Sequence, residues 1–321
     1  MRILITGATG FIGRRFVRAC QEAGIGDIAC LVRDRARARG LGLPEHALVE
    51  GDLADPDALR RGAAGAALII HLAASVRALR AADLFVANAG GTRLLLAAAE
   101  PAARFVLVSS LAAAGPSLDG RDTDRPAARC SPCSAYGESK RQAELALVAD
   151  AARTGRSWLV LRPGVVYGPG DAATRVLTAQ ARAWVTAVPP SPRPLSVIHV
   201  DDVCAALLAA VRKPEVQALF LPLVGNVPTD THSLLTAIAA AHGRRARLVP
   251  VPLPIARCAA HLAQAWARIT GRATFFNPDK VREIGAEGWV GDPEPAARAL
   301  GFRAQIDLRA GLAAVAAAPS A

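Results

Sequence analysis

Three glycines near the start of the chain constrain its fold more than any other feature. Gly7, Gly10 and Gly13 stand in the segment TGATGFIG, between the short apolar run Arg2–Thr6 and the helical pattern Phe11–Ala23. At such a turn the first glycine allows a tight bend, the second lets the backbone approach a pyrophosphate, and the third permits close contact between helix and strand. The helix N-terminus adds free N–H groups and a partial positive charge. The segment therefore predicts a dinucleotide site at the first strand-to-helix turn.

Apolar runs and helical patterns alternate through the first half of the chain. We expect further strands at Ile28–Arg33, Ala47–Glu50, Ala67–His71, Arg104–Ser109 and Trp158–Arg162. We expect further helices at Asp55–Arg61, Ala82–Glu100 and Tyr136–Thr154. The strands are continuous apolar runs, which is typical of strands buried on both faces. The alternation predicts an α/β fold with a doubly wound parallel sheet of the Rossmann type.

Beyond residue 162 the pattern is less regular. We expect a proline-rich loop, a strand returning to the sheet, a helix and a last strand at Val188–Pro194, Leu195–Val200, Asp201–Arg212 and Gln217–Leu221. We expect the remaining helices at Ser233–His242, Ile255–Ile269, Asp279–Ile284 and Leu308–Ala318. The chain then divides into a dinucleotide-binding domain at 1–165, whose sheet residues 195–221 rejoin, and a smaller, mostly helical substrate-binding portion at 166–194 and 222–321.

The charge balance bears on which partners are expected. The net charge is +11, but the basic residues are mostly scattered arginines and only 4% of the residues are aromatic. Platforms for stacking bases are therefore scarce, and we expect anionic small-molecule ligands rather than nucleic acid. No apolar run reaches the roughly 20 residues of a membrane span, and the first residues lack the apolar stretch of a secretory signal. We expect a cytoplasmic protein that acts on a small-molecule substrate, and a homodimer is compatible with the sequence.

The cysteines give little sign of a metal or a redox centre. Cys20 and Cys30 lie in apolar patterns and are expected in the core. Cys130 and Cys133 form a single CxxC pair, whereas a structural zinc site needs a second pair of ligands at suitable spacing. We expect no metal, and the pair is either two ordinary loop cysteines or a redox motif.

The choice between the two nicotinamide cofactors depends on the end of the second strand. A site for NAD usually places an acidic residue there, to bind the ribose 2′-hydroxyl. Arg33 stands in that place, which favours NADP(H) because a guanidinium can pair with a 2′-phosphate. Asp34 follows one residue later and keeps NAD(H) open. After the third strand, Asp52 either accepts from the adenine amino group, with Leu53 beside the ring, or caps the next helix.

A tyrosine and a lysine on one predicted helix indicate acid–base chemistry. Tyr136 and Lys140 are four residues apart and so share a helix face. A nearby ammonium is expected to lower the pKa of the phenol, which is near 10 in a free tyrosine. Ser110, at the carboxyl edge of the fifth strand, can hydrogen-bond the same substrate oxygen, since ligands of open α/β sheets bind at that edge.

Eight segments together give the chain a family resemblance over nearly its whole length. They are TGATGFIG, GDL at 51–53, HLAA at 71–74, NAGGT at 88–92, SSLAAAG at 109–115, YGESK at 136–140, LRPGVVYGPGD at 161–171 and IHVDDV at 198–203. With these segments the chain resembles the extended short-chain dehydrogenase/reductases, and in the layout of its C-terminal half the 3β-hydroxysteroid dehydrogenase-like members.

The resemblance implies roles for particular residues. It implies that Ser110, Tyr136 and Lys140 are the catalytic triad, and that Asn88 lies near the active site unless it is a capping or core amide. The residues it and the patterns above assign to the cofactor are Gly7, Thr9, Gly10, Phe11, Ile12, Gly13, Arg33, Asp52, Leu53, Leu72, Ala73, Ala74, Asn88, Tyr136, Lys140, Pro163, Val165 and Val166. His199 and Asp201 are expected to order the sheet edge and the start of a helix.

Departures from the family pattern narrow the reaction. Leu111 and Ala112 stand where related dehydratases carry an Asp-Glu pair, so elimination is disfavoured. The stretch before His199 lacks the charged pattern that nucleotide-sugar epimerases use for a diphosphate. We therefore expect an NAD(P)-dependent oxidoreductase acting on an alcohol or ketone of mainly apolar surface, with a nucleotide-sugar epimerase or a non-catalytic dinucleotide sensor as alternatives. The apolar stripe Ala259, Leu262, Trp266 and Ile269 is either plain core, a pocket wall or a membrane contact.

Overall fold

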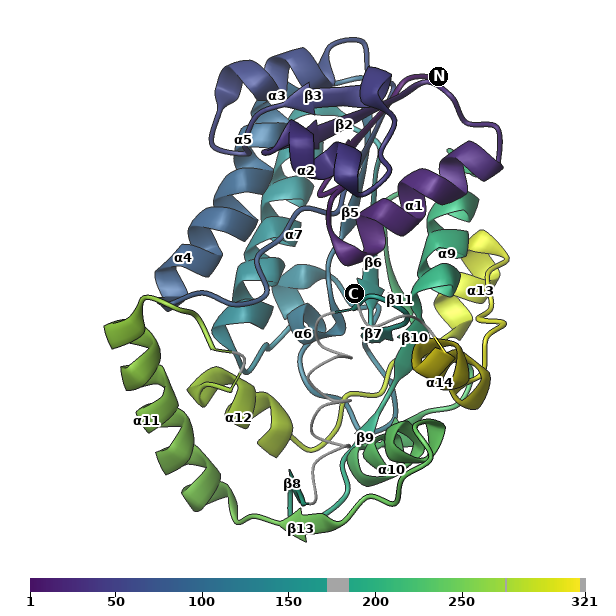
Figure 1. Ribbon diagram of the computed structural model, residues 1–321. Helices are drawn as coiled ribbons and strands as arrows, with labels where there is room; N and C mark the ends of the chain where they lie inside the picture. Colours follow the sequence, from purple (N-terminus) through teal and green to yellow (C-terminus); the bar gives the residue numbers. More distant parts are fainter. Residues whose placement is uncertain (172–184, 275, 318–321) are drawn as a thin grey trace.

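A seven-stranded parallel sheet forms the centre of the computed structural model, which describes residues 1–171, 185–274 and 276–317 (Figure 1). Its strands are β1 (Ile3–Thr6), β2 (Ile28–Val32), β3 (Leu48–Glu50), β4 (Leu68–His71), β5 (Arg104–Val108), β6 (Trp158–Pro163) and β11 (Leu219–Leu223). They lie in the order β11-β6-β5-β4-β1-β2-β3. The order reverses between β1 and β4, and ligands of doubly wound sheets bind outside the carboxyl ends of the strands at such a point. The expected Rossmann-type fold is confirmed.

Helices cover both faces of this sheet because its strands are apolar on both sides. On one face Ile3 and Ile5 of β1 pack with residues of α1 (Phe11–Glu22) and α9 (Val200–Arg212). On the other face Leu4 packs with residues of α3 (Pro56–Ala63), α5 (Gly91–Ala98) and α7 (Ala135–Thr154). Successive residues of a strand point to opposite faces, so one strand contributes to two separate cores.

The expected helix at 82–100 is divided into three segments around Asn88. It consists of α4 (Ala81–Phe85), a π-helical turn η2 (Val86–Gly90) and α5. Asn88 lies in the π turn, and a π turn inside a helix is often found at a functional site. The sequence pattern did not predict five short helices: α2 (Arg35–Gly40), α6 (Leu111–Ala114), α13 (Glu294–Leu300), and the 3₁₀ turns η1 (Glu45–Ala47) and η3 (Ala127–Arg129).

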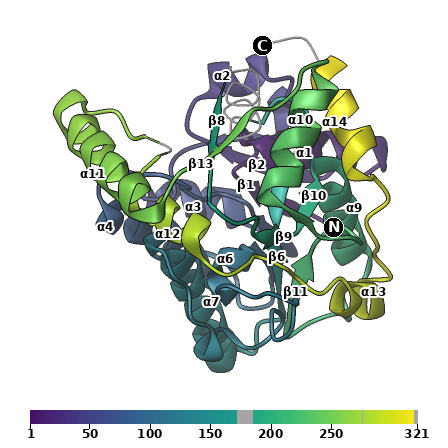
Figure 2. The same ribbon diagram turned by 90° about the horizontal axis from the view of Figure 1, so that it is seen from below.

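The second half of the chain adds a smaller portion below the sheet and on its flank (Figures 1 and 2). Its helices are α10 (Thr231–Ala241), α11 (Leu253–Thr270), α12 (Pro278–Gly285), α13 (Glu294–Leu300) and α14 (Leu308–Ala317). Its short strands are β7 (Val165–Tyr167), β8 (Thr186–Val188), β9 (Pro194–Leu195), β10 (Val197–His199), β12 (Thr229–Asp230) and β13 (Leu248–Pro250).

One strand expected in the main sheet lies elsewhere. Within 195–200 the structure has β9 and β10, which pair with β12 and β7 in two-stranded sheets, so the expected return of this segment to the main sheet is wrong. The preceding β7 diverges from the end of β6 and offers β10 its free edge. Of the segment 195–221, only β11 joins the main sheet, as its outermost strand. Residues 172–184, in the expected substrate-binding portion, and Ala318 lie outside the described residues.

A buried ion pair fixes helix α7 to the sheet. Arg162 of β6 and Glu144 of α7 are both fully buried, with Nη2–Oε2 and Nε–Oε1 distances of 2.6 and 3.0 Å. The guanidinium also donates to the carbonyls of Thr123 and Arg125 and lies over the ring of Phe220. A fifth hydrogen bond runs from Nη2 to Cys130 Sγ at 3.4 Å, so every donor of the guanidinium is used, as a buried charge requires. The helix that carries Tyr136 therefore has a defined position on β6.

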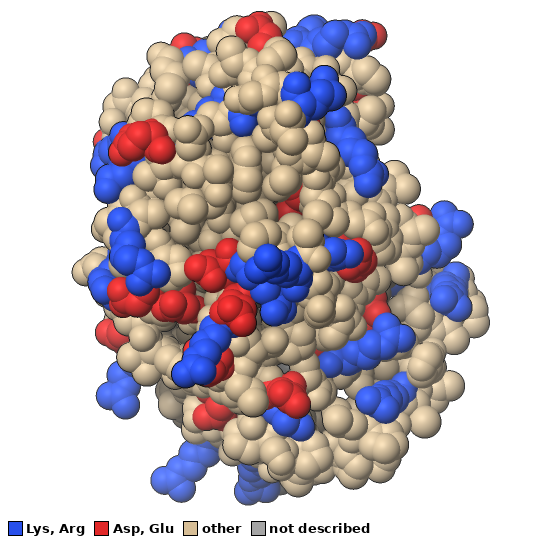
Figure 3. Space-filling view, turned by 180° about the vertical axis from the view of Figure 1, so that it is seen from behind, with Lys and Arg blue, Asp and Glu red and all other residues tan. Residues whose placement is uncertain are grey.

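The charged side chains form no single basic surface on the face opposite to that of Figure 1. Lysine and arginine are spread over it and interleaved with acidic side chains (Figure 3). Within the described part of the chain, no helix combines the length and the apolar character that a membrane span needs.

Candidate active site

The glycine-rich turn after β1 has the geometry that a pyrophosphate needs. Gly7 has a φ of +73°, and a Cβ there would lie 2.6 Å from the backbone nitrogen of Ala73, so only glycine fits. A Cβ on Gly13 would lie 2.1 Å from the carbonyl oxygen of Gly7. Gly10 is the N-cap of α1 and has no side chain to accept from the first N–H groups, which belong to Phe11, Ile12 and Gly13. These free donors at a helix N-terminus fit the phosphates of a dinucleotide.

The register of β1 and β4 brings two predicted segments together. Thr6 of β1 pairs with His71 of β4. The next residues, Gly7 and Leu72, therefore lie beside each other where the strand order reverses. The Ala73 nitrogen donates to Thr6 Oγ1 at 3.3 Å. Leu72 and Ala73 therefore lie directly beside the glycine turn, and contact of residues 72–74 with the cofactor stays a prediction.

Ser110, Tyr136 and Lys140 converge from two elements at the carboxyl edge of β5. Ser110 directly precedes α6 and caps it, its Oγ accepting from the Ala112 nitrogen at 3.1 Å. Tyr136 and Lys140 lie on the first two turns of α7, which Ser134 caps. The side chains of Tyr136 and Ser110 share a hydrogen bond. Lys140 Nζ donates to the carbonyl oxygen of Val108 at 2.7 Å and is buried.

The ionisation of Tyr136 differs from the expectation. Burial raises the pKa of Tyr136 to about 12, against the opposing hydrogen bond with Ser110, and the Glu283 carboxylate raises it further. The predicted net lowering of this pKa is wrong for this structure, because desolvation outweighs the hydrogen bond with Ser110, and Lys140 makes no resolved contribution. Burial also lowers the pKa of Lys140 to about 8, opposed by Glu144. At neutral pH Tyr136 is therefore a protonated phenol, which is the form that donates a proton.

Asn88 holds the loop after β4 against the catalytic helix. Its Nδ2 donates to the Ser75 carbonyl at 2.9 Å and to Ser139 Oγ at 2.8 Å, while its Oδ1 accepts from the Ser75 nitrogen at 2.7 Å. Ser139 Oγ in turn donates to the Tyr136 carbonyl at 2.7 Å. The side-chain amide is buried and engaged on both ends, so these contacts agree with the core-amide interpretation, and a direct contact with the cofactor stays a prediction.

Arg33 and Asp34, the two candidates for contact with the ribose of the cofactor, have different surroundings at the end of β2. Arg33 directly follows β2, and its side chain is 80% exposed, with Nε 3.9 Å from Asp52 Oδ2. Asp34 is the N-cap of α2, where its Oδ1 accepts from the Arg37 nitrogen at 2.8 Å. The acid that kept NAD open is thus engaged in a cap, whereas the guanidinium faces solvent.

Asp52, Leu53 and Asp55, which follow β3, make different contacts. Asp52 accepts from the Ala54 nitrogen at 2.9 Å, and Asp55, not Asp52, caps α3. Leu53 packs on Gly91, where a Cβ would lie 2.9 Å from Leu53 Cδ1. The helix-cap alternative for Asp52 is therefore wrong, and its contact with adenine stays a prediction.

The remaining predicted positions lie around the same edge or order it. Thr9 is half-buried in the glycine turn, Pro163 ends β6, and Val165 and Val166 lie on β7. His199 caps α9 by accepting from the Asp201 nitrogen at 3.3 Å, as expected for a residue that orders the helix start.

The cysteine pair shows no sign of redox activity. All six cysteines are free, and Cys130 is buried and accepts from the Arg162 guanidinium at 3.4 Å. Burial raises the pKa of the Cys133 thiol, which disfavours the reactive thiolate.

Two acidic residues that the sequence patterns did not single out contact the start of α7. Asp279 Oδ2 accepts from the Ala135 nitrogen at 3.2 Å, and Glu283 Oε1 accepts from Ser134 Oγ at 2.7 Å. Both lie on α12, more than 140 residues from these partners in the sequence. No local pattern could have linked them, although acids near a helix N-terminus are favourable.

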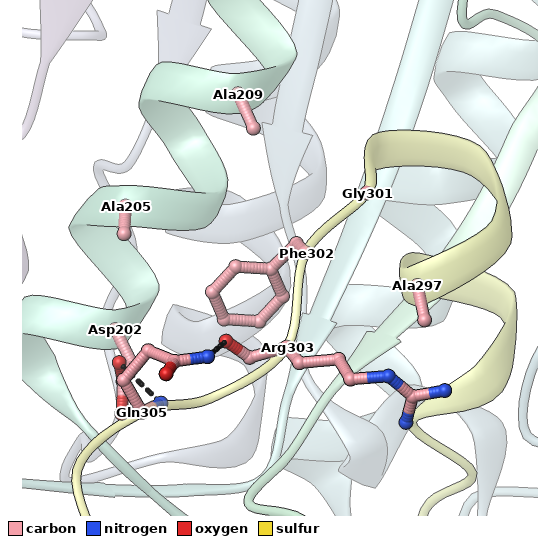
Figure 4. Close-up of a pocket in the computed structure, with 8 residues that line it drawn as sticks. All are labelled: Asp202, Ala205, Ala209, Ala297, Gly301, Phe302, Arg303 and Gln305. Carbon is pink, nitrogen blue, oxygen red and sulfur yellow. Dashed lines mark hydrogen bonds between the residues drawn. The ribbon is translucent and has the colours of Figure 1, made fainter.

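Two surface hollows lie away from these residues. One, of about 430 Å³, lies between α9 and the α13–α14 connection, where Asp202 accepts from the Gln305 nitrogen (Figure 4). The other, of about 650 Å³, lies beside the outer strand β11 and is lined by Trp158 and Phe220 among others. Neither is lined by the serine, tyrosine or lysine of the site.

A doubly wound sheet, a glycine turn and a Ser-Tyr-Lys arrangement at one edge define an enzyme that works with a dinucleotide. The profile of the NAD dependent epimerase/dehydratase family matches residues 3–219, and the chain belongs to this family. It is 35% identical to a ceramide reductase of Caulobacter vibrioides, over 92% of this chain and 87% of that protein. It is 32% identical to the 4-hydroxy-2-methyl-3-oxo-4-farnesyl-3,4-dihydroquinoline-1-oxide ketoreductase of Stigmatella aurantiaca, over 90% of this chain and 93% of that protein.

The fold is shared with more distant members of known structure. The UDP-glucose 4-epimerase of Thermus thermophilus, solved with NAD, superposes with a TM-score of 0.76 at 20% identity, covering 98% of both chains. Such a likeness establishes the fold. The family membership makes the chain an NAD-dependent enzyme of the oxidoreductase and epimerase type.

Proposed function

We propose that this enzyme reduces a ketone on a mainly apolar substrate, and catalyses the reverse oxidation of the alcohol, with Tyr136 as general acid and base. The observation that carries the proposal is the placement of Tyr136 beside Ser110 at the carboxyl edge of β5, together with the apolar residues that follow Ser110. Leu111 and Ala112 are buried and apolar, so no acid–base pair for elimination stands after Ser110.

The chemistry requires one hydride and one proton. A bound nicotinamide supplies the hydride to the carbonyl carbon, or takes it from the alcohol. Ser110 hydrogen-bonds the substrate oxygen and orients it toward Tyr136. Tyr136 donates its proton to that oxygen as negative charge develops there, and accepts it in the reverse reaction. Lys140 lies one helical turn after Tyr136, and its ammonium donates to the Val108 carbonyl, so it positions the start of α7 against the edge of β5.

The apolar substrate class is supported from two sides. The stretch before His199 is rich in proline and carries Arg193 as its single charged side chain, so few groups are available for a sugar diphosphate. The two relatives that span about nine-tenths of the chain are named for the reduction of a ceramide and of a farnesyl-bearing ketone. Both names favour net reduction over epimerisation.

We further propose NADP(H) as the preferred cofactor. Arg33 is exposed at the end of β2, and Asp34 is committed to the cap of α2. A 2′-phosphate would therefore meet a guanidinium rather than a free carboxylate.

Steady-state assays test the proposed reaction. We expect NADPH consumption with carbonyl substrates, and affinity that rises with carbon count by about 25 cal/mol per Å² of buried apolar area. The same preparation is assayed with UDP-, dTDP- and GDP-sugars, and Tyr136→Phe measures the background. Turnover confined to nucleotide sugars, without net consumption of cofactor, would show an epimerase instead.

A further inference from the structure

Helix α11 presents an apolar face that the described part of the chain leaves exposed. Ile255, Leu262, Trp266 and Ile269 are 59, 73, 67 and 78% exposed. They are spaced by seven, four and three residues, so they lie on one face of the helix. The interpretation of this stripe as core is therefore wrong, and a patch of this kind on a protein surface marks an interaction site.

The opposite face anchors the helix. Ala260 and Ala267 are its buried residues, and Gln264 Nε2 donates to the Leu79 carbonyl at 2.9 Å. Both views place α11 at the periphery, beyond α12 (Figures 1 and 2). The helix is thus held by its small and polar side while its large apolar side chains face outward.

The sequence on both sides of the α11 stripe carries charge of one sign. Residues 231–278 contain no aspartate or glutamate, whereas the chain as a whole has 27 acidic residues. The same segment has six arginines: Arg244, Arg245, Arg247, Arg257, Arg268 and Arg272. Arg257 and Arg268 lie on α11 itself and are exposed. The apolar side chains, with a tryptophan among them, lie on one face of α11 and the two arginines lie toward the other, which is the pattern of a helix that lies in the plane of an anionic lipid surface.

We propose that α11 docks this enzyme on anionic membranes, lying in the plane of the headgroups with its apolar face toward the acyl chains. Arginine stems can extend along the helix so that their guanidinium groups meet lipid phosphates. A second copy of the chain fits this face less well, because two arginine-bearing segments without acids repel each other. Four side chains on one helix also fall short of the about 800 Å² per partner that a stable interface buries.

Co-sedimentation of the full chain with vesicles tests this docking without any turnover, so its outcome is independent of the proposed reaction. Phosphatidylcholine vesicles are compared with equimolar phosphatidylcholine and phosphatidylglycerol. We expect binding to the anionic vesicles that weakens as salt is raised. The double variant Leu262→Glu/Trp266→Glu should lose at least tenfold in affinity. Arg257→Gln/Arg268→Gln should lose about fivefold for each arginine.

A matched control separates this face from general surface apolarity. Val227 is 78% exposed and lies outside α11, so Val227→Glu should bind vesicles like the unaltered protein. Circular dichroism checks that each variant is folded. We expect folding to be retained because the altered side chains are exposed. Equal vesicle binding by the unaltered protein and the Leu262→Glu/Trp266→Glu variant would overturn the proposal. So would a dimer, seen in sedimentation equilibrium, that this variant dissociates while vesicle binding is absent in both.

Discussion

Thr6 Oγ1 and His71 Nδ1 lie 2.6 Å apart across the two strands between which the sheet order reverses. On its other side His71 Nε2 lies 3.0 Å from Thr92 Oγ1, which donates to the Asn88 carbonyl. Asn88 then reaches Ser139 on the catalytic helix. A continuous buried chain of hydrogen bonds thus links the strand before the glycine turn with the helix of Tyr136, and a neutral imidazole is at its centre.

The neutral state of His71 predicts a loss of stability in acid. Burial, reinforced by the Lys140 charge, lowers the pKa of His71 from 6.5 to about 3. Between these values the unfolded chain binds a proton that the folded chain does not, so stability falls as the pH is lowered from 6.5. The contribution of this group approaches about 1.4 kcal/mol per pH unit.

Urea unfolding at pH 7, 6 and 5 measures this slope. His71→Gln should show a shallower fall than the unaltered protein between pH 6 and 5, although it is less stable at pH 7. His46→Gln, which alters an exposed residue of η1, should follow the unaltered slope. Identical slopes in all three proteins would show that His71 does not carry the effect.

Replacing Tyr136 by phenylalanine should remove catalysis and leave the fold intact. The ring stays in place while the proton donor is lost, so kcat should fall by about 10²–10⁴. Dinucleotide affinity, measured by fluorescence titration, should change little. The chain has one other tyrosine, Tyr167, whose hydroxyl donates to the Asp307 carbonyl, and Tyr167→Phe serves as the control. Near-normal turnover in Tyr136→Phe would contradict the assignment.

Arg33→Asp should reverse the choice of cofactor. The new carboxylate would repel a 2′-phosphate and could accept from a 2′-hydroxyl, so the ratio of NADPH to NADH affinity should drop by at least tenfold. Arg212→Asp changes the net charge equally at the exposed end of α9 and should leave the ratio unchanged. A preference for NADH in the unaltered protein would show that Arg33 does not select the cofactor.

Gly7 and Gly24 have the same φ but different surroundings. Alanine at each position therefore separates the cost of backbone strain from the cost of a steric clash. Gly7 and Gly24 both have a φ of +73°, but nothing lies within 4 Å of a Cβ on Gly24. Gly24→Ala should therefore cost only the left-handed conformation, about 1–2 kcal/mol. Gly7→Ala adds the collision with Ala73, and should cost more than twice as much and abolish dinucleotide binding. Urea unfolding and titration with NADPH measure both effects, and equal costs would mean that the turn relaxes freely.

Local patterns were sufficient for much of this protein. The strand, glycine turn and helix at residues 3–22 depend on neighbouring residues, and the same holds for the spacing of Tyr136 and Lys140 within one helix. Apolar runs located every strand of the main sheet because burial on both faces imposes a composition that each strand carries by itself.

Tertiary structure decided what depends on distant neighbours. The pKa of Tyr136 follows from burial and from Glu283, and neither is visible in the spacing of a YxxxK pattern. Segments far apart in the chain supply the partner strand of β10 and the partners of Asn88 in the π turn. They also supply the acids that contact the start of α7. The stripe on α11 has the same sequence pattern whether it faces a core or a surface. Periodicity defines a face of a helix but not what covers that face. The burial of Ala260 and Ala267 on the opposite face of α11 shows that the stripe faces outward.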